Sequence, residues 1–182
     1  LRLDYSPRRG VTFFVQAREE VKARNLPGDG NLYFTGEGSR MNVWVSGEFV
    51  VTPGFSLKSR FQGSQYELGD RTTRGMAIVQ EVTVKKTRWS FSIRYALFDT
   101  DDYENRQYVY EKNVWLATSL PAYEGSGVRN YVLVHYSVSR HLDIWLRWAR
   151  TVYTDRASIG SGMELITGNA RNDINFQVRI RP

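Results

Sequence analysis

The feature that most constrains this chain is a strict alternation of apolar and polar side chains, which recurs in stretch after stretch. Near the C-terminus, for example, polar residues separate Ile174, Phe176, Val178 and Ile180. Successive side chains of a β-strand point to opposite faces, so such a stretch forms a strand with one apolar and one polar face. A helical period of 3.6 is hard to find over any comparable window. The sequence therefore predicts an all-β chain.

The alternation predicts eight long antiparallel strands, at residues 11–22, 41–52, 55–66, 76–85, 89–98, 130–139, 142–153 and 174–180. They are about nine to twelve residues long, above the usual five or six. Residues 1–5 alternate too and are interpreted as the tail of a ninth strand, cut at Leu1. We expect about 8–10 strands in one domain over residues 1–182, arranged up-and-down. Eight strands from residue 11 onward could close a small barrel by themselves, but a ninth strand would require more strands from elsewhere, and the preferred interpretation is part of a larger, incomplete barrel.

The predicted connections alternate strictly between short and long. The short ones are residues 6–10, 53–54, 86–88 and 140–141, and the long ones are 23–40, 67–74, 99–127 and 154–172. An up-and-down sheet would gather all short turns at one end, as in outer-membrane barrels. Within 99–127, residues 107–119 contain strand-like sequence. We expect this segment to be an extracellular loop with a projecting hairpin.

Composition narrows the possibilities further. The chain of 182 residues is 41% hydrophobic and 24% charged, which excludes a disordered or low-complexity chain. No apolar run approaches the eighteen or so residues of a membrane helix. The absence of cysteine removes disulfides, thiolate catalysis and Cys-type metal sites.

Alternation alone does not say whether the apolar face lines a core or contacts lipid. A soluble barrel or sandwich fits the length. Three features favour lipid: the strands match the nine to eleven residues that cross a bilayer at a tilt, the loops are segregated by end, and aromatics gather near strand ends. The candidates for these aromatic girdles are Phe55, Trp89, Tyr136, Trp148 and Tyr153.

The lipid interpretation assigns each strand face an environment. We expect these apolar residues to face lipid: Phe13, Val15, Val43, Val45, Phe91, Ile93, Val132, Val134, Ile144, Leu146, Phe176 and Val178. The opposite face mixes both charge signs, as a salt-bridged lumen would. Its predicted lumenal residues are Arg18, Glu20, Glu48, Lys58, Arg60, Glu81, Lys85, Arg94, His135, Ser137, Asp143, Arg147, Gln177 and Arg179.

Four stretches carry a resemblance to a known family: residues 94–103, 155–162, 166–171 and 177–179. With them the chain resembles the C-terminal barrel region of Bacteroidota outer-membrane proteins whose N-terminal part carries helix-hairpin-helix repeats. The resemblance covers most of the chain and implies a transmembrane barrel longer than this chain, with these residues as its last strands. One departure is the end, where residues 180–182 lack the terminal aromatic that resembles an assembly signal.

Candidate chemistry is sparse. His135 and Ser137 share a strand face and resemble the catalytic pair of the outer-membrane phospholipase family, although that family uses the lipid-facing surface. A lumenal hydrogen-bonding histidine is the preferred interpretation. Asp99 and Asp101 belong to an acidic run that is a weak metal candidate, because it lacks the glycine and distal glutamate of a calcium loop. The glycines of residues 159–162 lack the Lys-Ser/Thr of a phosphate loop.

The resulting prediction is a non-enzymatic protein of a Gram-negative outer membrane that acts as a channel, scaffold or partner platform. We expect no cofactor, and we expect outer-membrane lipid and lipopolysaccharide as neighbours, with another barrel segment or complex subunits as partners. The net charge of +6 is spread over strands and turns, so no nucleic acid is expected. The alternatives are a soluble β-barrel that binds a small apolar ligand and, next, an outer-membrane lipid hydrolase.

Overall fold

The computed structural model describes residues 1–27 and 33–181, and 73% of the chain is strand. Nine strands form one sheet, and two shorter pairs lie in the connections. The strands of the large sheet are β1 (Arg2–Arg8), β2 (Val11–Pro27), β3 (Tyr33–Thr52), β4 (Phe55–Leu68), β5 (Arg71–Lys85), β6 (Trp89–Thr100), β9 (Ser126–Ser137), β10 (Leu142–Tyr153) and β13 (Ala170–Ile180). The prediction of an all-β chain is confirmed.

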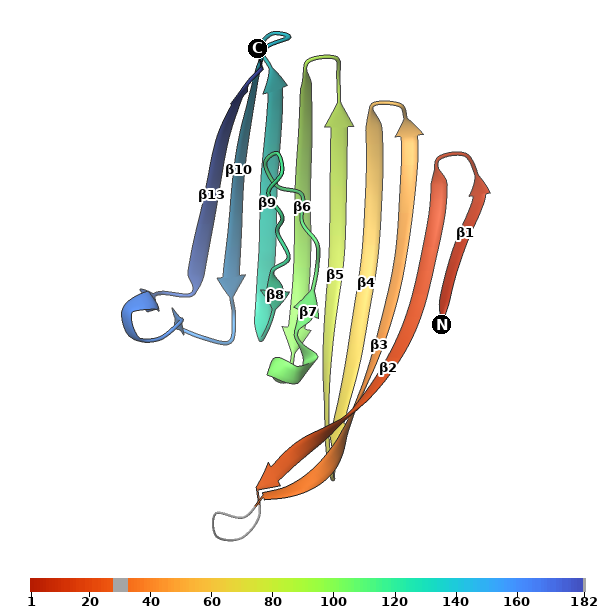
Figure 1. Ribbon diagram of the computed structural model, residues 1–182, viewed down its shortest axis with the longest axis vertical. Helices are drawn as coiled ribbons and strands as arrows, with labels where there is room; N and C mark the ends of the chain where they lie inside the picture. Colours follow the sequence, from red (N-terminus) through yellow and green to blue (C-terminus); the bar gives the residue numbers. More distant parts are fainter. Residues whose placement is uncertain (28–32, 182) are drawn as a thin grey trace.

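The sheet is an antiparallel meander in the order β1-β2-β3-β4-β5-β6-β9-β10-β13, so each strand pairs with its neighbour along the chain (Figure 1). The predicted up-and-down arrangement is therefore confirmed. The described residues form no closed barrel, because β1 and β13 lie at opposite edges and do not pair with each other. Each of these two strands leaves one row of backbone donors and acceptors without a strand partner in the described part of the chain.

The strands are longer than the alternation predicted, and they lengthen at the end that carries the long connections. The predicted long loop at 67–74 is wrong: β4 and β5 pair from Leu68↔Arg71 onward and are joined by a tight turn. Gly69 makes this turn possible, with φ of 59°. Much of the predicted loop at 23–40 is strand as well, since β2 and β3 stay paired out to Pro27↔Tyr33. The Gly28-Asp29-Gly30 part of that prediction lies outside the described residues.

Burial follows the alternation in an unusual direction, because the polar face is the covered one. On β5 and β6, Glu81, Thr83, Ser92 and Arg94 are buried, whereas the apolar side chain of Ile93 between them is 42% exposed. The same holds on β10, where Asp143 and Arg147 are 1% and 2% exposed. Over β5, β6 and β10 the sheet thus exposes apolar side chains and buries charged ones.

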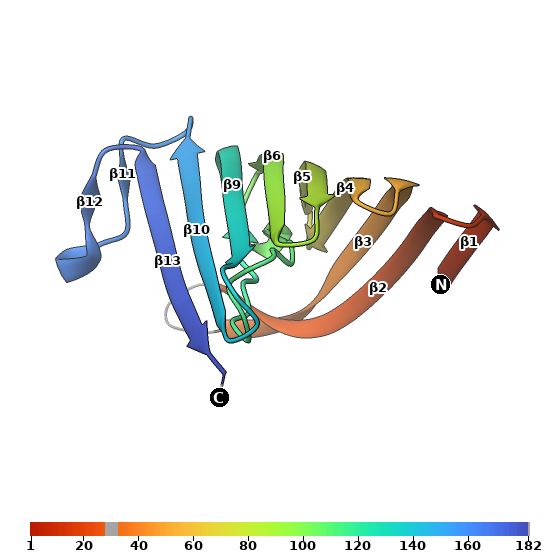
Figure 2. The ribbon, with the colours of Figure 1, turned by 90° about the horizontal axis from the view of Figure 1, so that it is seen from above.

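The connection between β6 and β9 covers this polar face. We call residues 101–125 the inner segment; it contains η1 (Tyr103–Asn105), β7 (Gln107–Tyr108) and β8 (Ala122–Tyr123). Figure 2 shows it on the concave side of the curved sheet. The prediction of a hairpin that projects away from the sheet is therefore wrong. The segment folds back because its own polar groups, which include the buried Asn105, Gln107 and Glu111, find hydrogen-bond partners on the sheet.

The connection between β10 and β13 is smaller and lies beyond the sheet's end. It contains β11 (Ser158–Ile159), η2 (Gly162–Glu164) and β12 (Ile166–Thr167), and β11 pairs with β12. Most of its side chains are exposed, including Met163 and Leu165.

A glycine on β5 permits the inner segment to approach the sheet. A Cβ at Gly75 would lie 2.5 Å from the backbone oxygen of Asn105. We expect Gly75→Ala to displace η1 and to increase protease cleavage of the inner segment about tenfold, equivalent to about 1.4 kcal/mol. Limited proteolysis of the folded protein measures this. The control is Gly63→Ala, whose Cβ would sit at an ordinary 3.5 Å from Phe61. Equal cleavage of both variants would contradict the close-approach argument.

Candidate functional site

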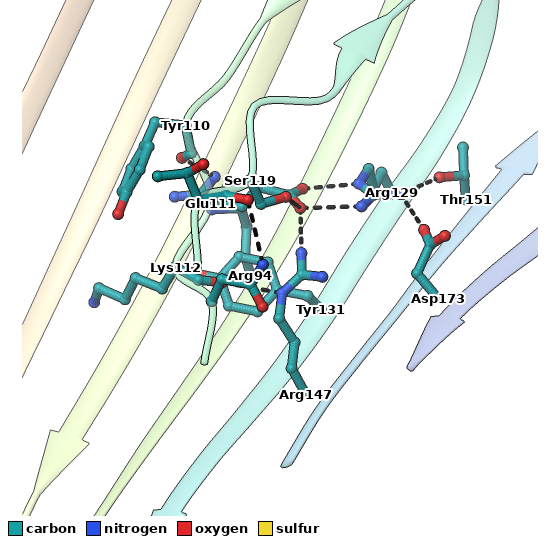
Figure 3. Close-up of polar contacts among 12 residues, drawn as sticks. Arg94, Tyr110, Glu111, Lys112, Ser119, Arg129, Tyr131, Arg147, Thr151 and Asp173 are labelled. Atoms are coloured by element: carbon teal, nitrogen blue, oxygen red, sulfur yellow. Dashed lines mark hydrogen bonds and ion pairs between the residues drawn. The ribbon is translucent and has the colours of Figure 1, made fainter. Parts of the chain in front are cut away.

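The candidate site is the charged contact between the inner segment and the concave face, and its centre is Glu111. This carboxylate is fully buried. Its Oε1 accepts hydrogen bonds from Arg129 Nε at 2.8 Å and from Tyr123 Oη at 3.0 Å. Its Oε2 accepts from Arg129 Nη2 at 3.0 Å and from the guanidinium of Arg147. Figure 3 shows both arginines converging on Glu111 from the sheet.

The sheet topology positions the two arginines. Arg129 lies on β9 and Arg147 on β10, and these strands are direct neighbours. In the register of the two strands, Arg129 is opposite Thr151, and Thr151 and Arg147 are an even number of residues apart on β10. Both arginine side chains therefore point to the same, polar face of the sheet. Arg129 also donates to Thr151 Oγ1 at 2.7 Å and to Asp173 Oδ2 at 3.2 Å on β13. One arginine therefore ties the inner segment to the last three strands of the sheet.

A second buried ion group lies beside the first and is built around Glu81 on β5. Arg94 Nε donates to Glu81 Oε2 at 2.9 Å, and Tyr131 Oη donates to the same oxygen at 2.5 Å. Lys112 of the inner segment reaches Glu81 Oε1 with its Nζ at 2.7 Å. The two groups are joined through Lys112, because Arg147 Nε donates to its backbone oxygen at 3.0 Å.

Tyrosines complete the electrostatics of the site. The guanidinium carbons of Arg94 and Arg147 lie 5.1 and 5.2 Å from the centroid of the Tyr131 ring, within cation–π range. In the inner segment, burial and the neighbouring Glu111 carboxylate raise the pKa of the Tyr123 phenol well above its usual range. Tyr123 therefore stays protonated and keeps donating to Glu111.

The rest of the inner segment is fixed by neutral contacts. At one end, Ser64 Oγ donates to Asn105 Oδ1 at 2.9 Å, and Asn105 Nδ2 donates to Thr73 Oγ1 at 2.8 Å. At the other, the Trp115 ring stacks on Trp145 with 6.4 Å between centroids. Between them a small apolar cluster packs segment against sheet, formed by Ala77, Val79, Ala96, Phe98, Val109 and Tyr123. The inner segment is thus held at three separate places.

His135 and Ser137, which resemble a catalytic pair in sequence, are not arranged for nucleophilic catalysis. Ser137 Oγ donates to Asp143 Oδ1 at 2.7 Å, and His135 Nε2 lies 3.2 Å from the same oxygen. Both side chains therefore contact the carboxylate, which also accepts from Arg179 Nη2 at 2.6 Å. The His135 ring stacks on Trp145 at 4.5 Å between centroids. This is the hydrogen-bonding role that the sequence favoured for His135, with Asp143 as the partner.

The weak metal candidates are used in loop contacts. Asp99 accepts a hydrogen bond from the Ser126 hydroxyl, and Asp101 Oδ2 accepts from the backbone N–H of Arg74 at 2.7 Å. Among residues 1–27 and 33–181, no group of three or more His, Cys, Asp or Glu side chains converges as a metal site would.

The residues predicted for the two faces differ in exposure, although the two sets overlap. Of the residues predicted to face a lumen, Glu81, Arg94, Asp143 and Arg147 are buried, and the others are half-buried or exposed on the same polar face. None of the residues predicted to face lipid is buried. One girdle candidate is misplaced: the Tyr153 ring packs edge-on against Phe98 at 5.9 Å, on the polar face.

Sequence reasoning missed the members of the site that matter most. Tyr131 and Arg129 share the parity of His135 on β9, so following the alternation back from His135 by three steps of two residues would have found both. Glu111 and Lys112 carry no such signal, because they lie in a segment whose backbone is mostly irregular.

Comparison of the chain with protein-family models, curated proteins and solved structures gives no match. Across the described residues, neither helical turn has the length and apolarity that a membrane-crossing helix needs. The proposals below therefore depend on the residues and contacts of this chain alone.

Removal of the central charge tests the site. Glu111→Gln keeps the shape but leaves the buried guanidinium of Arg147 without a carboxylate and that of Arg129 with Asp173 alone, so we expect a loss of about 3–5 kcal/mol in unfolding free energy. The control on the same segment is Glu104→Gln, whose partly exposed pair with Arg24 spans 3.1 Å. Surface pairs contribute about 0–1 kcal/mol. Denaturant titration measures both variants, and equal stability would show that Glu111 does not anchor the segment.

Proposed function

We propose that this chain is a non-enzymatic β-barrel segment of a Gram-negative outer membrane, acting as a channel, scaffold or partner platform. The observation that carries the proposal is the direction of burial: the sheet covers its charged face and exposes its apolar one. In water such an arrangement would be unfavourable, because apolar surface is stable when it is removed from water. In a bilayer it is the arrangement that the surroundings require.

The extent of the apolar face supports this proposal. Exposed apolar side chains run across neighbouring strands at matching registers, for example Val134 at 37% exposure, Leu146 at 47% and Phe176 at 66%. Aromatic residues lie towards the tight-turn end of this face, where Trp89 pairs with Tyr136. Monomeric soluble proteins rarely expose a continuous apolar patch of this kind.

Curvature argues against the soluble alternative. A soluble barrel that binds an apolar ligand needs its apolar face inside. In this sheet the inner segment lies on the concave side and contacts the polar face (Figure 2). Continuing the same curvature to closure places the apolar residues outside, against lipid.

A membrane location would also require the sheet edges to be satisfied. Unpaired backbone N–H and C=O groups cost several kcal/mol each in hydrocarbon, so only closed barrels cross a bilayer as strands. The free edges of β1 and β13 are therefore where further strands would pair, from the rest of a larger barrel or from another chain. Outer-membrane lipid and lipopolysaccharide would contact the apolar face and the connections.

The inner segment bears on the choice among channel, scaffold and platform. It fills the concavity with buried ion pairs, as plugs and folded-in loops do in known barrels. This favours a scaffold, or a channel that is closed in this conformation, over an open pore.

The lipid-hydrolase alternative has weak geometric support. A serine nucleophile needs a base that takes its proton, and here Ser137 donates to a carboxylate that is already shared by Arg179 and Arg181. That alternative requires phospholipid hydrolysis that Ser137→Ala abolishes. We expect wild type and variant to give the same background rate.

Electrophoresis tests the membrane proposal directly. We expect the protein, extracted from its native membrane, to partition into detergent and to migrate differently on a denaturing gel before and after heating, because closed barrels resist detergent until heated. A second chain or a larger parent mass would identify the strands that pair with β1 and β13. A 21.1 kDa monomer that is soluble in plain buffer would contradict the proposal.

One substitution separates lipid from water as the environment of the apolar face. Ile93 lies mid-strand and exposed, so Ile93→Arg would be nearly neutral in water. In a bilayer it is expected to cost about 2–4 kcal/mol of folding free energy. The control is Thr72→Arg, on the same face beside the β4–β5 turn and opposite Glu67. Folding titrations in lipid vesicles give the cost, and a neutral Ile93→Arg would count against lipid.

A further inference from the structure

A cavity between the sheet and the inner segment carries more positive than negative charge. It has a volume of about 130 Å³ and is lined by Lys58, Arg60, Val79, Glu81, Arg94, Val109, Tyr110 and Lys112. The lining comes from β4, β5 and β6 on one side and from the inner segment on the other. Four cations thus surround one carboxylate.

Of the four cationic side chains that line the cavity, three form ion pairs with a carboxylate of the described residues and one does not. Arg94 and Lys112 share Glu81, and Lys58 Nζ lies 3.5 Å from Glu48 Oε2 outside the cavity. Within residues 1–27 and 33–181, Arg60 has no carboxylate at ion-pair distance, and its buried Nε has no hydrogen-bond partner. A half-buried guanidinium without a counter-charge is costly, and here it also faces other cations.

We infer that this cavity binds a small tetrahedral oxyanion, such as phosphate or a phosphate monoester. Lys58 and Arg60 approach from β4 and Lys112 from the inner segment, so donors reach a bound group from different directions. A phosphate group carries nearly two negative charges and several acceptor oxygens, and arginine binds such groups with two parallel hydrogen bonds. Val79, Val109 and Tyr110 form the remaining wall.

The site is built entirely from described strands and the inner segment, so it does not depend on the membrane location proposed above. Its ligand would contact both the wall and the segment that fills the concavity. Bound anion would therefore stabilise the docked inner segment, by mass action on the state that binds it.

Calorimetric titration of the full chain in detergent with inorganic phosphate tests this inference. We expect saturable binding by wild type, binding at least tenfold weaker by Arg60→Gln, and intermediate binding by Arg60→Lys. The matched control is Arg18→Gln, an exposed cation on the polar face of β2 that lies outside the cavity. It should bind phosphate as wild type does.

Thermal unfolding provides a second readout that does not depend on the affinity measurement. Phosphate should raise the melting temperature of wild type and of Arg18→Gln but leave that of Arg60→Gln unchanged. Without phosphate, Arg60→Gln should be at least as stable as wild type, because an unpaired charge has been removed; this also shows that the variant folds.

Titration with glycerol phosphate distinguishes the source of the anion. Binding of both ligands indicates a site for monoesters, and binding of phosphate alone indicates a site for the free ion. Absence of saturable phosphate binding by wild type, or equal binding by wild type and Arg60→Gln, would overturn the inference. Heat-modifiable migration of the same samples reports separately on the barrel proposal.

Discussion

The requirement that buried charges be paired governs this structure. The concave face presents Arg129 and Arg147 on adjacent strands, and no residue of those strands neutralises both. Glu111 of the inner segment neutralises both arginines. Burial of its carboxylate would in turn be strongly unfavourable without such donors around it. Charge therefore fixes the centre of the connection between β6 and β9, while neutral hydrogen bonds, the stack of Trp115 on Trp145 and a small apolar cluster hold the rest of it.

The two faces of the sheet obey different physical rules. On the concave face, side chains form hydrogen bonds and ion pairs, and the ring of Tyr131 contacts the guanidinium groups of Arg94 and Arg147. On the convex face, most side chains are apolar at successive registers, and polar contacts such as that between Ser59 and Gln80 are isolated pairs among the described residues. This division separates a concave side held by directional contacts between named pairs from a convex side whose stability depends on the surrounding medium.

Much of the fold follows from the sequence because strand alternation is a local property. The strands, their faces and the order of the sheet were all predictable from residues such as Ile93 and Arg94, whose neighbours repeat the same pattern. The turn at Gly69 was missed because a tight turn and a longer loop share the same residue types. Tyr153 was misassigned because it was chosen as an aromatic near a strand end, although it shares the parity of Arg147 and Thr151 and so lies on the polar face, where it packs on Phe98.

The site was less predictable than the fold, because its residues are far apart in the sequence. Arg129, Arg147 and Asp173 lie on the polar face by parity, yet nothing in their local sequence indicates that Glu111 joins them. That contact depends on a segment whose path is fixed by partners far along the chain. His135 is an intermediate case. The sequence predicted that His135 and Asp143 lie on the same face, but it did not predict that they contact each other.

The inner segment leaves and rejoins the sheet at the same end, between two strands that are paired along their whole length, from Asp99↔Ser126 to Trp89↔Tyr136. In topological terms it is an insert in a hairpin loop, and the meander is continuous without it. Such an insert is separable: the strand order would survive its exchange for a short turn, while the lining of the concavity would change completely. Sequence changes confined to this one connection could therefore alter what fills the concave side while the nine-stranded sheet stays the same.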